Sequence, residues 1–556
     1  MHFRLPYPKK RTLLVFAGII VLCTLFLLPY LGSVNLFDSN EVNYAESSRE
    51  MILTGDYMNV QIDFEPFPEK PPLFFWLQVI SMKIFGVNEF AARFPNFICS
   101  IVTLIILYSL GKKVYGHRFG LFWVLSFGSA ILPLFFFKSG IIDPWFNLLL
   151  FSGIALFILY MFGKRKGTRM LNVAFSALLL GLAVLTKGPL AVTVFFICLL
   201  IFLILRRFTF KMTFAEGALF SSVLLLVGGS WYLYQLIIGN AYVLSEFFQY
   251  GWDILFAEKK VHDGFFGYHL VILLLGVFPA SVISMKSITK KSEHTELQRV
   301  FKHWMYIMIV VVIVIYSIAR TKLLNYSSLA YFPLTFLAAW VWDKWVDRKT
   351  EIGTWQVILI FFIALFYSGL VIVIPLIANH PDLLSRSRAS FIDEFTRAAL
   401  QRNVHWSGSE WMVGIFLIIG VAVSLVQILR RNTRGMLILH VVVMLFVTAS
   451  LYIFTGRIEE YTQRSAINFY KGLKGQEVYV MPLGFKGYSH LYYFDKQEGE
   501  EQLTVDEMME NELDRDAYFV IQVDKKEAIL ERYPQLEVIS ERYGYVFTVK
   551  RTVSTQ

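Results

Sequence analysis

Acidic and basic side chains gather in one short stretch near the amino terminus, between apolar segments too long for a soluble core. The stretch begins with Asp38 and Glu41 and ends with Glu69-Lys70-Pro71-Pro72. A carboxylate here could act as a general base and accept a proton from an acceptor hydroxyl. The alternative is that Asp38 and Glu41 are solvated charges at a helix start, where the helix dipole favours negative charge. We take both as candidate catalytic residues.

The two prolines of Glu69-Lys70-Pro71-Pro72 give this motif a defined direction, because proline fixes its own φ and restricts the residue before it. A lysine held in this way could neutralise a phosphate, and the adjacent glutamate could bind a metal ion or orient the lysine. The alternative is an exposed ion pair, which contributes about 0–1 kcal/mol.

Further charges interrupt apolar segments later in the chain. Asp143 directly precedes a proline, and a carboxylate so close to hydrocarbon is costly unless it meets water, a cation or a partner. It could instead be a simple N-cap. We take Asp143 as a third candidate catalytic residue. Lys187, Arg320 and Lys322 lie on the predicted external side, where positive charge is not expected. Together with Lys70 they indicate an external anion site, although each one alone could be a snorkelling side chain.

The composition places these groups on a membrane protein. The chain has 556 residues, of which 56% are hydrophobic and 17% charged, against roughly 45–50% and 25% in soluble domains. A spanning helix needs about 20 apolar residues. This criterion predicts about thirteen spans: Leu13–Tyr30, Ala91–Leu110, Phe119–Phe137, Pro144–Phe162, Met170–Leu185, Pro189–Leu205, Ala218–Ile238, Tyr268–Ile283, Trp304–Ile318, Leu323–Trp342, Trp355–Ile377, Trp411–Ile428 and Met436–Phe454.

The loops between these spans predict the topology. Lys and Arg concentrate in every second loop, which is typical of cytoplasmic loops. We therefore predict a cytoplasmic amino terminus, a retained first span, and external loops over residues 32–90, 239–267 and 378–410. Within the first loop, Asn43–Leu53 and Leu73–Phe85 have the pattern of helices lying along the membrane surface.

The sequence after the last span changes character. Short runs with strand-like composition alternate with two helical segments, Val505–Leu513 and Lys525–Arg532. We therefore predict an α-helical polytopic membrane protein with a transmembrane domain over residues 1–455 and a small soluble α/β domain over residues 456–556. An odd number of spans puts this second domain on the outer side of the membrane.

Several function classes are disfavoured. The net charge of +10 comes from short basic clusters between apolar segments, so it follows membrane topology and does not indicate nucleic-acid binding. Cys23, Cys99 and Cys198 lie within apolar segments without metal-type spacing. The sequence has no HExxH, paired CxxC, phosphate-binding glycine loop or GxSxG motif, so a nucleotide cofactor is not indicated.

The motifs in chain order are Phe-Asp-x-x-Glu-x-x-Tyr-Ala-Glu from Phe37, Glu-Lys-Pro-Pro-Leu from Glu69, Asp-Pro from Asp143, Leu-Thr-Lys-Gly-Pro from Leu185, and Thr-Lys-Leu from Thr321 followed by Tyr326. This order resembles the aminoarabinose transferases, a branch of the membrane-embedded GT-C glycosyltransferases that also includes the protein O-mannosyltransferases. The resemblance covers residues 1–454. It implies the GT-C fold and transfer of a sugar from an undecaprenyl-phosphate (polyprenyl-phosphate) carrier at the outer face of a bacterial inner membrane.

The resemblance also implies roles for individual residues. Lys70 would face the carrier phosphate, Glu69 and His262 would be candidate ligands of a divalent metal ion, and Asp143 and Lys187 would line the cavity. The remaining candidates for donor binding are Tyr44, Arg320, Lys322 and Tyr326. A lone histidine such as His262 is also compatible with a structural or merely exposed side chain.

One position departs from the family pattern, because Asn40 stands where a candidate catalytic aspartate is usual. Asparagine cannot act as a base. Either Asp38 or Glu41 takes that role, or the acceptor is already anionic, as a lipid phosphate is, or the protein is an inactive glycolipid receptor. Asn325 likewise replaces a frequent histidine.

The leading hypothesis is a glycosyltransferase that moves a sugar from a polyprenyl phosphate to an envelope acceptor such as lipid A, another glycan or a protein, with inversion at the sugar. A protein O-mannosyltransferase-like activity is the alternative within enzymes. A polyprenyl-lipid transporter or flippase is the alternative from another class, although transporters often have two related halves and none is recognisable here.

Overall fold

The computed structural model describes residues 9–38, 40–256, 265–288, 295–319, 321–379, 393–499 and 503–552. Helices dominate these residues. Those up to the last predicted span are α1 (Lys9–Leu27), α2 (Asn40–Thr54), α3 (Leu73–Phe85), α4 (Glu89–Val114), α5 (His117–Gly128), α6 (Ile131–Phe137), α7 (Asp143–Met161), α8 (Lys166–Lys187), α9 (Leu190–Leu205), α10 (Phe214–Gly228), α11 (Ser230–Ile237), α12 (Ala241–Phe256), α13 (Tyr268–Gly276), α14 (Ala280–Ser284), η1 (Met285–Ser287), α15 (Glu296–Ile318), η2 (Tyr326–Ala330), α16 (Tyr331–Val346), α17 (Thr354–Asn379), α19 (Glu394–Ala399), α20 (Trp411–Leu429) and α21 (Thr433–Thr462). A two-stranded hairpin, β1 (Gln61–Ile62) and β2 (Glu65–Pro66), lies between α2 and α3.

The prediction of a polytopic helical membrane protein is confirmed. Eight helices in the described residues are individually long and apolar enough to cross a membrane, and three bent helix pairs raise this number to eleven. The other two predicted spans correspond to α9 and α16, of 16 residues each, which is shorter than the roughly 20 residues that the hydrocarbon core requires. Two of the bends have a local cause, since they fall at Gly229 and Pro279.

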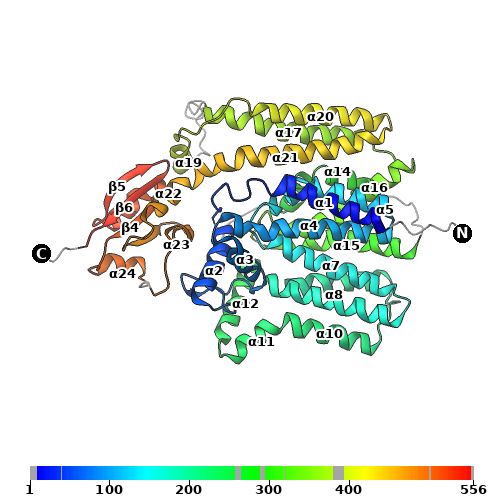
Figure 1. The fold of residues 1–556 in the computed structure, drawn as a ribbon, viewed down its shortest axis with the longest axis horizontal. Helices are drawn as coiled ribbons and strands as arrows, with labels where there is room; N and C mark the ends of the chain where they lie inside the picture. The colour runs from blue at the N-terminus through cyan, green and yellow to red at the C-terminus, as the bar shows by residue number, and fades with distance from the viewer. Residues whose placement is uncertain are drawn as a thin grey trace.

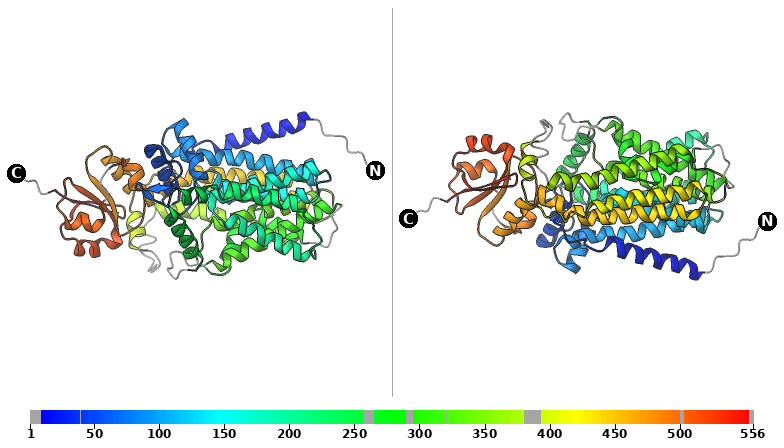
Figure 2. Two further views of the ribbon diagram at one scale, coloured as in Figure 1. Left: turned by 90° about the horizontal axis from the view of Figure 1, so that it is seen from below. Right: turned by 90° about the horizontal axis from the view of Figure 1, so that it is seen from above.

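The helices run along the longest axis of the molecule, with a separate small domain beyond one end of the bundle (Figure 1). Helix α1 begins at the opposite end of the bundle, and two further views agree with this arrangement (Figure 2). The short helices α2, α3 and α12 lie at the end of the bundle that faces the small domain. The first loop is therefore placed between the spanning helices and the small domain.

The small domain is built on a four-stranded mixed sheet. Its elements are α22 (Arg464–Leu473), β3 (Tyr479–Leu483), α23 (Ser489–Phe494), α24 (Val505–Glu510), β4 (Ala517–Gln522), η3 (Val523–Lys525), α25 (Lys526–Arg532), β5 (Glu537–Arg542) and β6 (Tyr545–Lys550). The strand order is β3-β4-β6-β5, with β3 parallel to β4 and the other two pairs antiparallel. Sequence analysis did not predict β5, because it is a largely exposed edge strand with little apolar alternation.

The small domain is attached to the first loop by buried polar contacts. The Arg49 guanidinium in α2 forms an ion pair with Asp495 at 3.0 Å, and the backbone amide of Leu36 donates to the Tyr493 hydroxyl at 2.6 Å. Ten of the fifteen residues of α2 are buried. The prediction of a helix here is confirmed, and α23 and α3 pack against it. Its position along the membrane surface stays a prediction.

Candidate active site

The first loop holds its charged turn in place through the packing of α2 against α3. Ser48 donates a hydrogen bond to the Gln78 side chain at 3.0 Å. The rings of Phe74 and Phe75 stand edge-on to Tyr44, with centroids 5.8 and 5.7 Å away. Because the two helices are locked together, the turn that precedes α3 has a fixed position relative to the bundle.

Lys70, in that turn, is a cation without a carboxylate partner among the described residues. Its ammonium donates to the backbone carbonyl of Glu69 at 2.9 Å and lies 4.6 Å from the centre of the Tyr250 ring. Burial lowers the pKa of the Lys70 ammonium to about 8, against the attraction of the Glu69 carboxylate. A positive charge in such surroundings favours the binding of an anion.

Lys187 and Asp143 form the second charged unit of the site. The Lys187 ammonium contacts one carboxylate oxygen of Asp143 at 2.5 Å, and the Asn325 amide donates to the other oxygen at 2.7 Å. Asp143 is only 2% exposed. Its carboxylate therefore has both oxygens engaged, and Asp143 acts here as the counter-ion of Lys187.

A large cavity of about 420 Å³ joins the two lysines. It continues from the lysines along apolar side chains of α9, α12 and α15. Its lining includes Asn40, Tyr44, Glu69, Lys70, Lys187, Leu190, Ile197, Phe247, Tyr250, Ile315, Tyr316, Leu323, Asn325 and Tyr326. We call it the lysine cavity. A charged end joined to an apolar groove is suited to a phosphate carried on a hydrocarbon chain.

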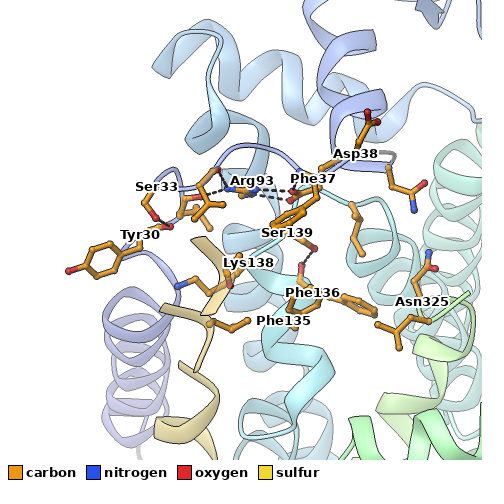
Figure 3. A pocket seen from close by; sticks show the side chains of 18 of the residues that line it. Tyr30, Ser33, Phe37, Asp38, Arg93, Phe135, Phe136, Lys138, Ser139 and Asn325 are labelled. Atoms are coloured by element: carbon orange, nitrogen blue, oxygen red, sulfur yellow. Dashed lines mark hydrogen bonds and ion pairs between the residues drawn. The ribbon is translucent and has the colours of Figure 1, made fainter. Parts of the chain in front are cut away.

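A second cavity, of about 340 Å³, meets the first at a shared wall. Both are lined by Asn40, Leu323 and Asn325. The second cavity extends past Lys138 to Tyr30 and Tyr452, which are 57% and 55% exposed. Figure 3 shows Lys138 and Tyr30 from different elements around the same space. We call it the lateral cavity, since its far end is open to the surroundings of the bundle.

Two of the predicted catalytic carboxylates, Asp38 and Glu41, line the lateral cavity but have partners of their own. The Glu41 oxygens accept hydrogen bonds from Arg93 at 2.8 and 3.0 Å and from the Gly140 amide at 2.5 Å. Figure 3 shows the Arg93 end of this ion pair beside the lateral cavity. Burial favours the neutral acid, but Arg93 outweighs it and the Glu41 pKa lies below its ordinary value. Glu41 is thus a stably ionised structural partner.

Asp38 faces the small domain. Its carboxylate lies against residues 487–489, where a Cβ added to Gly487 would come within 2.5 Å of one oxygen. The Ser489 hydroxyl and nearby backbone amides act on the same carboxylate. In Figure 3 the Asp38 carboxylate points away from Lys138. Asp38 therefore connects the first loop to the small domain.

The other predicted residues fall into two groups. Tyr44 and Tyr326 line the lysine cavity, as does Glu69. Lys322 does not, because its three donors bind the carbonyls of Tyr316, Ser317 and Ala319 at the end of α15, which leaves none for a phosphate. The predicted roles of His262 and Arg320 fall on positions outside the described residues.

The predicted metal site has only one of its two ligands in the described residues. Glu69 supplies a carboxylate, and no group of three His, Cys, Asp or Glu side chains converges among the residues described. The described side chains therefore do not by themselves provide a fitting donor set, and no chemical step is derived through a metal here.

Three comparisons with known proteins bear on this site. A family model described as dolichyl-phosphate-mannose-protein mannosyltransferase matches residues 69–232, which include Lys70, Asp143 and Lys187. A Wigglesworthia glossinidia brevipalpis protein named undecaprenyl phosphate-alpha-4-amino-4-deoxy-L-arabinose arabinosyl transferase is 26% identical over 339 residues, 58% of each chain. A Sodalis glossinidius protein named as transferase 1 of the same kind is 27% identical, over 57% of this chain and 58% of its own.

The fold comparison covers nearly the whole molecule. A crystal structure of ArnT from Cupriavidus metallidurans bound to undecaprenyl phosphate superposes with a TM-score of 0.75, at 19% identity, over 99% of both chains. The chain therefore has the fold of this ArnT structure, and its sequence is similar to those of the aminoarabinose transferases. The predicted GT-C fold with a small carboxy-terminal sheet domain is thereby confirmed. The sequence matches themselves span 58% of the relatives' length.

Three residues of this GT-C chain that shape the two cavities were not singled out from the sequence. Tyr250 reaches the site from α12, Lys138 lies just after α6, and Arg93 pairs with Glu41 from α4. The sequence could have identified Lys138 as a candidate site residue, since it is a lysine five residues before Asp143 on the predicted external side. It could not have identified Tyr250, because nothing distinguishes this residue among the 28 tyrosines of the chain.

Proposed function

We propose that the protein is a glycosyltransferase that takes a sugar from a polyprenyl-phosphate carrier and transfers it to an anionic acceptor of the bacterial envelope. The observation that carries this proposal is Lys70, a half-buried ammonium without a carboxylate partner in the described residues, at the head of a cavity with apolar walls. A lipid phosphate supplies the negative partner that the Lys70 ammonium lacks, and the hydrocarbon chain of the lipid fits the apolar groove. The undecaprenyl phosphate named for the matching ArnT structure has this chemistry.

The reaction follows from the position of the two cavities. The carrier phosphate lies at Lys70, with its sugar directed toward the wall that the cavities share. An acceptor oxygen enters through the lateral cavity and forms a bond to the anomeric carbon, while the bond from that carbon to the phosphate oxygen breaks. The electron pair leaves on the polyprenyl phosphate, and the fixed charge of Lys70 stabilises it, which is usually the largest contribution in such catalysis. Attack opposite the leaving phosphate inverts the sugar.

The acceptor is best matched by a group that is already ionised. Asn40 at the shared wall cannot accept a proton, and the carboxylates around the two cavities have other partners. Glu41 pairs with Arg93, Asp143 with Lys187, Asp38 lies against residues 487–489, and Glu69 is engaged by the Tyr250 hydroxyl. A phosphate oxygen, as on lipid A, needs no base. A protein hydroxyl does, so the mannosyltransferase-like alternative, favoured by the family model over residues 69–232, fits these contacts less well.

The proposed location is a bacterial inner membrane with the small domain outside and the amino terminus in the cytoplasm. The basic loops that alternate along the sequence support this orientation. The start of α1 and the small domain also lie at opposite ends of the bundle (Figures 1 and 2). A divalent metal ion at Glu69 and His262 remains a hypothesis within this proposal.

The test is release of polyprenyl phosphate from a panel of polyprenyl-phosphate sugars by the full chain in lipid. We expect release that depends on a phosphorylated envelope lipid and that Lys70→Ala abolishes. Lys83→Ala, at an exposed lysine near the end of α3 that hydrogen-bonds Tyr57, is the matched control. Transbilayer movement of the lipid without any sugar transfer would overturn the proposal in favour of a flippase.

A further inference from the structure

Tyr250 stands between two oppositely charged neighbours in the lysine cavity. Its ring covers the Lys70 ammonium at 4.6 Å. Its hydroxyl faces the Glu69 carboxylate, and this contact together with burial raises the Tyr250 pKa above its ordinary value. Within the described part of the chain, Glu69 and Lys70 form no ion pair with each other, since the ammonium donates to the Glu69 backbone carbonyl instead. One side chain therefore contacts both charges and separates them.

The position of Tyr250 is set by the packing of α12. Phe247, one turn earlier, fits over Gly188, where a Cβ would lie only 2.6 Å from the Phe247 ring. The Phe247 ring also packs against Trp231 and Tyr232, with centroids 6.2 and 5.7 Å apart. Phe248, which is 55% exposed, stacks on the same Tyr232 ring with centroids 6.3 Å apart. With its inner side fixed in this way, α12 directs Tyr250 toward the turn that carries Lys70.

The chemistry of Glu69, Lys70 and Tyr250 indicates what Tyr250 does in the site. A carboxylate next to a half-buried ammonium such as that of Lys70 is attracted to it, and a carboxylate bound there competes with an incoming phosphate. The hydroxyl offers Glu69 an alternative partner, and the ring holds the ammonium through a cation–π contact, which leaves the nitrogen accessible to an oxygen ligand.

We propose that Tyr250 is a positioning residue that keeps the Glu69 carboxylate off Lys70, so that the ammonium remains available to the phosphate of the lipid carrier. This inference rests on the proposed function insofar as the ligand is a polyprenyl phosphate. It concerns binding and does not depend on which sugar or acceptor takes part.

The experiment measures binding of undecaprenyl monophosphate to the full chain in nanodiscs at pH 7.5. We expect Tyr250→Phe to weaken binding by roughly tenfold, a change of about 1.4 kcal/mol, because Glu69 is released onto Lys70. Glu69→Gln should bind at least as tightly as the wild type. The double variant Tyr250→Phe/Glu69→Gln should regain wild-type affinity, a rescue that a merely structural role for Tyr250 does not produce.

Two controls separate this inference from the proposed function. Tyr232→Phe removes a buried hydroxyl that has no hydrogen-bond partner in the described residues and that packs on the same helix, so it should leave binding unchanged. Lys70→Ala should abolish binding in every background, and tight binding by that variant would overturn the proposed function itself. Wild-type affinity in Tyr250→Phe, or a double variant as weak as Tyr250→Phe, would overturn only the role of Tyr250.

Discussion

Asp143 and Lys187 form a 2.5 Å ion pair in which the carboxylate is 2% exposed and also accepts from Asn325 at 2.7 Å. The two lysines of the lysine cavity thus differ in their ionic partners. Lys187 is neutralised within the protein, whereas Lys70 has no ionic partner among the described residues and is left for a ligand. A buried pair of this type contributes modest net stability when intact but is costly to break on one side.

The first prediction concerns this pair. Lys187→Met leaves the Asp143 carboxylate buried without a cation, and Asp143→Asn leaves Lys187 without an anion, so each single variant should lose about 3–5 kcal/mol of stability. The double variant should lose less than either, because it buries no unpaired charge. Thermal unfolding of the purified protein in detergent measures all four forms. If the double variant lost as much stability as the two single variants together, the two side chains would not be coupled.

The second prediction is a pH dependence of donor binding. The free Lys70 ammonium has a pKa of about 8, and a bound phosphate raises it, so the complex holds more protons than the free protein above that pH. Affinity for undecaprenyl phosphate should therefore be constant below about pH 8 and fall up to about tenfold per pH unit above it. Lys70→Arg, whose guanidinium stays charged, should bind with little change up to pH 9.5. If the wild type and Lys70→Arg had the same pH profile, the loss of affinity at high pH would come from a group other than Lys70.

Sequence analysis predicted the elements of this molecule well because its signals are local. Apolar length alone identifies the spans, and the helix predicted over Leu73–Phe85 has the same bounds in the structure. The burial of α2 could not be foreseen, since it arises from α23, more than 430 residues later in the chain.

The site was predicted less completely, for a physical reason. A sequence motif identifies which charges are present but not which of them neutralise one another. Asp38 and Glu41 looked alike in the first loop, yet Arg93 pairs with one and residues 487–489 face the other. Lys322 looked like Lys70, but helix α15 uses all of its donors. Only tertiary contacts distinguish a cation left for a ligand from one that caps a helix.

The third prediction follows from the position of Asp38 against the small domain. Asp38→Asn should keep most of the sugar-transfer rate, within about threefold of the wild type, because the Asp38 carboxylate lies against residues 487–489 although the residue lines the lateral cavity. A general base typically contributes about 10²–10⁴-fold. Proteolysis of the small domain should become faster instead. A loss of transfer by a hundredfold or more, with the domain still protected, would assign Asp38 a direct part in the chemistry.

The fourth prediction concerns Lys138 in the lateral cavity. Its ammonium donates to the Pro29 carbonyl at 2.9 Å, and burial, together with the charge of Arg93, lowers its pKa to about 8. If the acceptor brings its anionic group through this cavity, Lys138→Ala should raise the KM for the acceptor by about tenfold, as expected for a lost charge-assisted hydrogen bond. Affinity for undecaprenyl phosphate should not change, because that ligand binds at Lys70 on the other side of the shared wall. The measurement is the transfer rate as a function of acceptor concentration, with Lys83→Ala as the control variant. A weaker donor affinity with an unchanged acceptor KM would mean that the lateral cavity admits the carrier and not the acceptor.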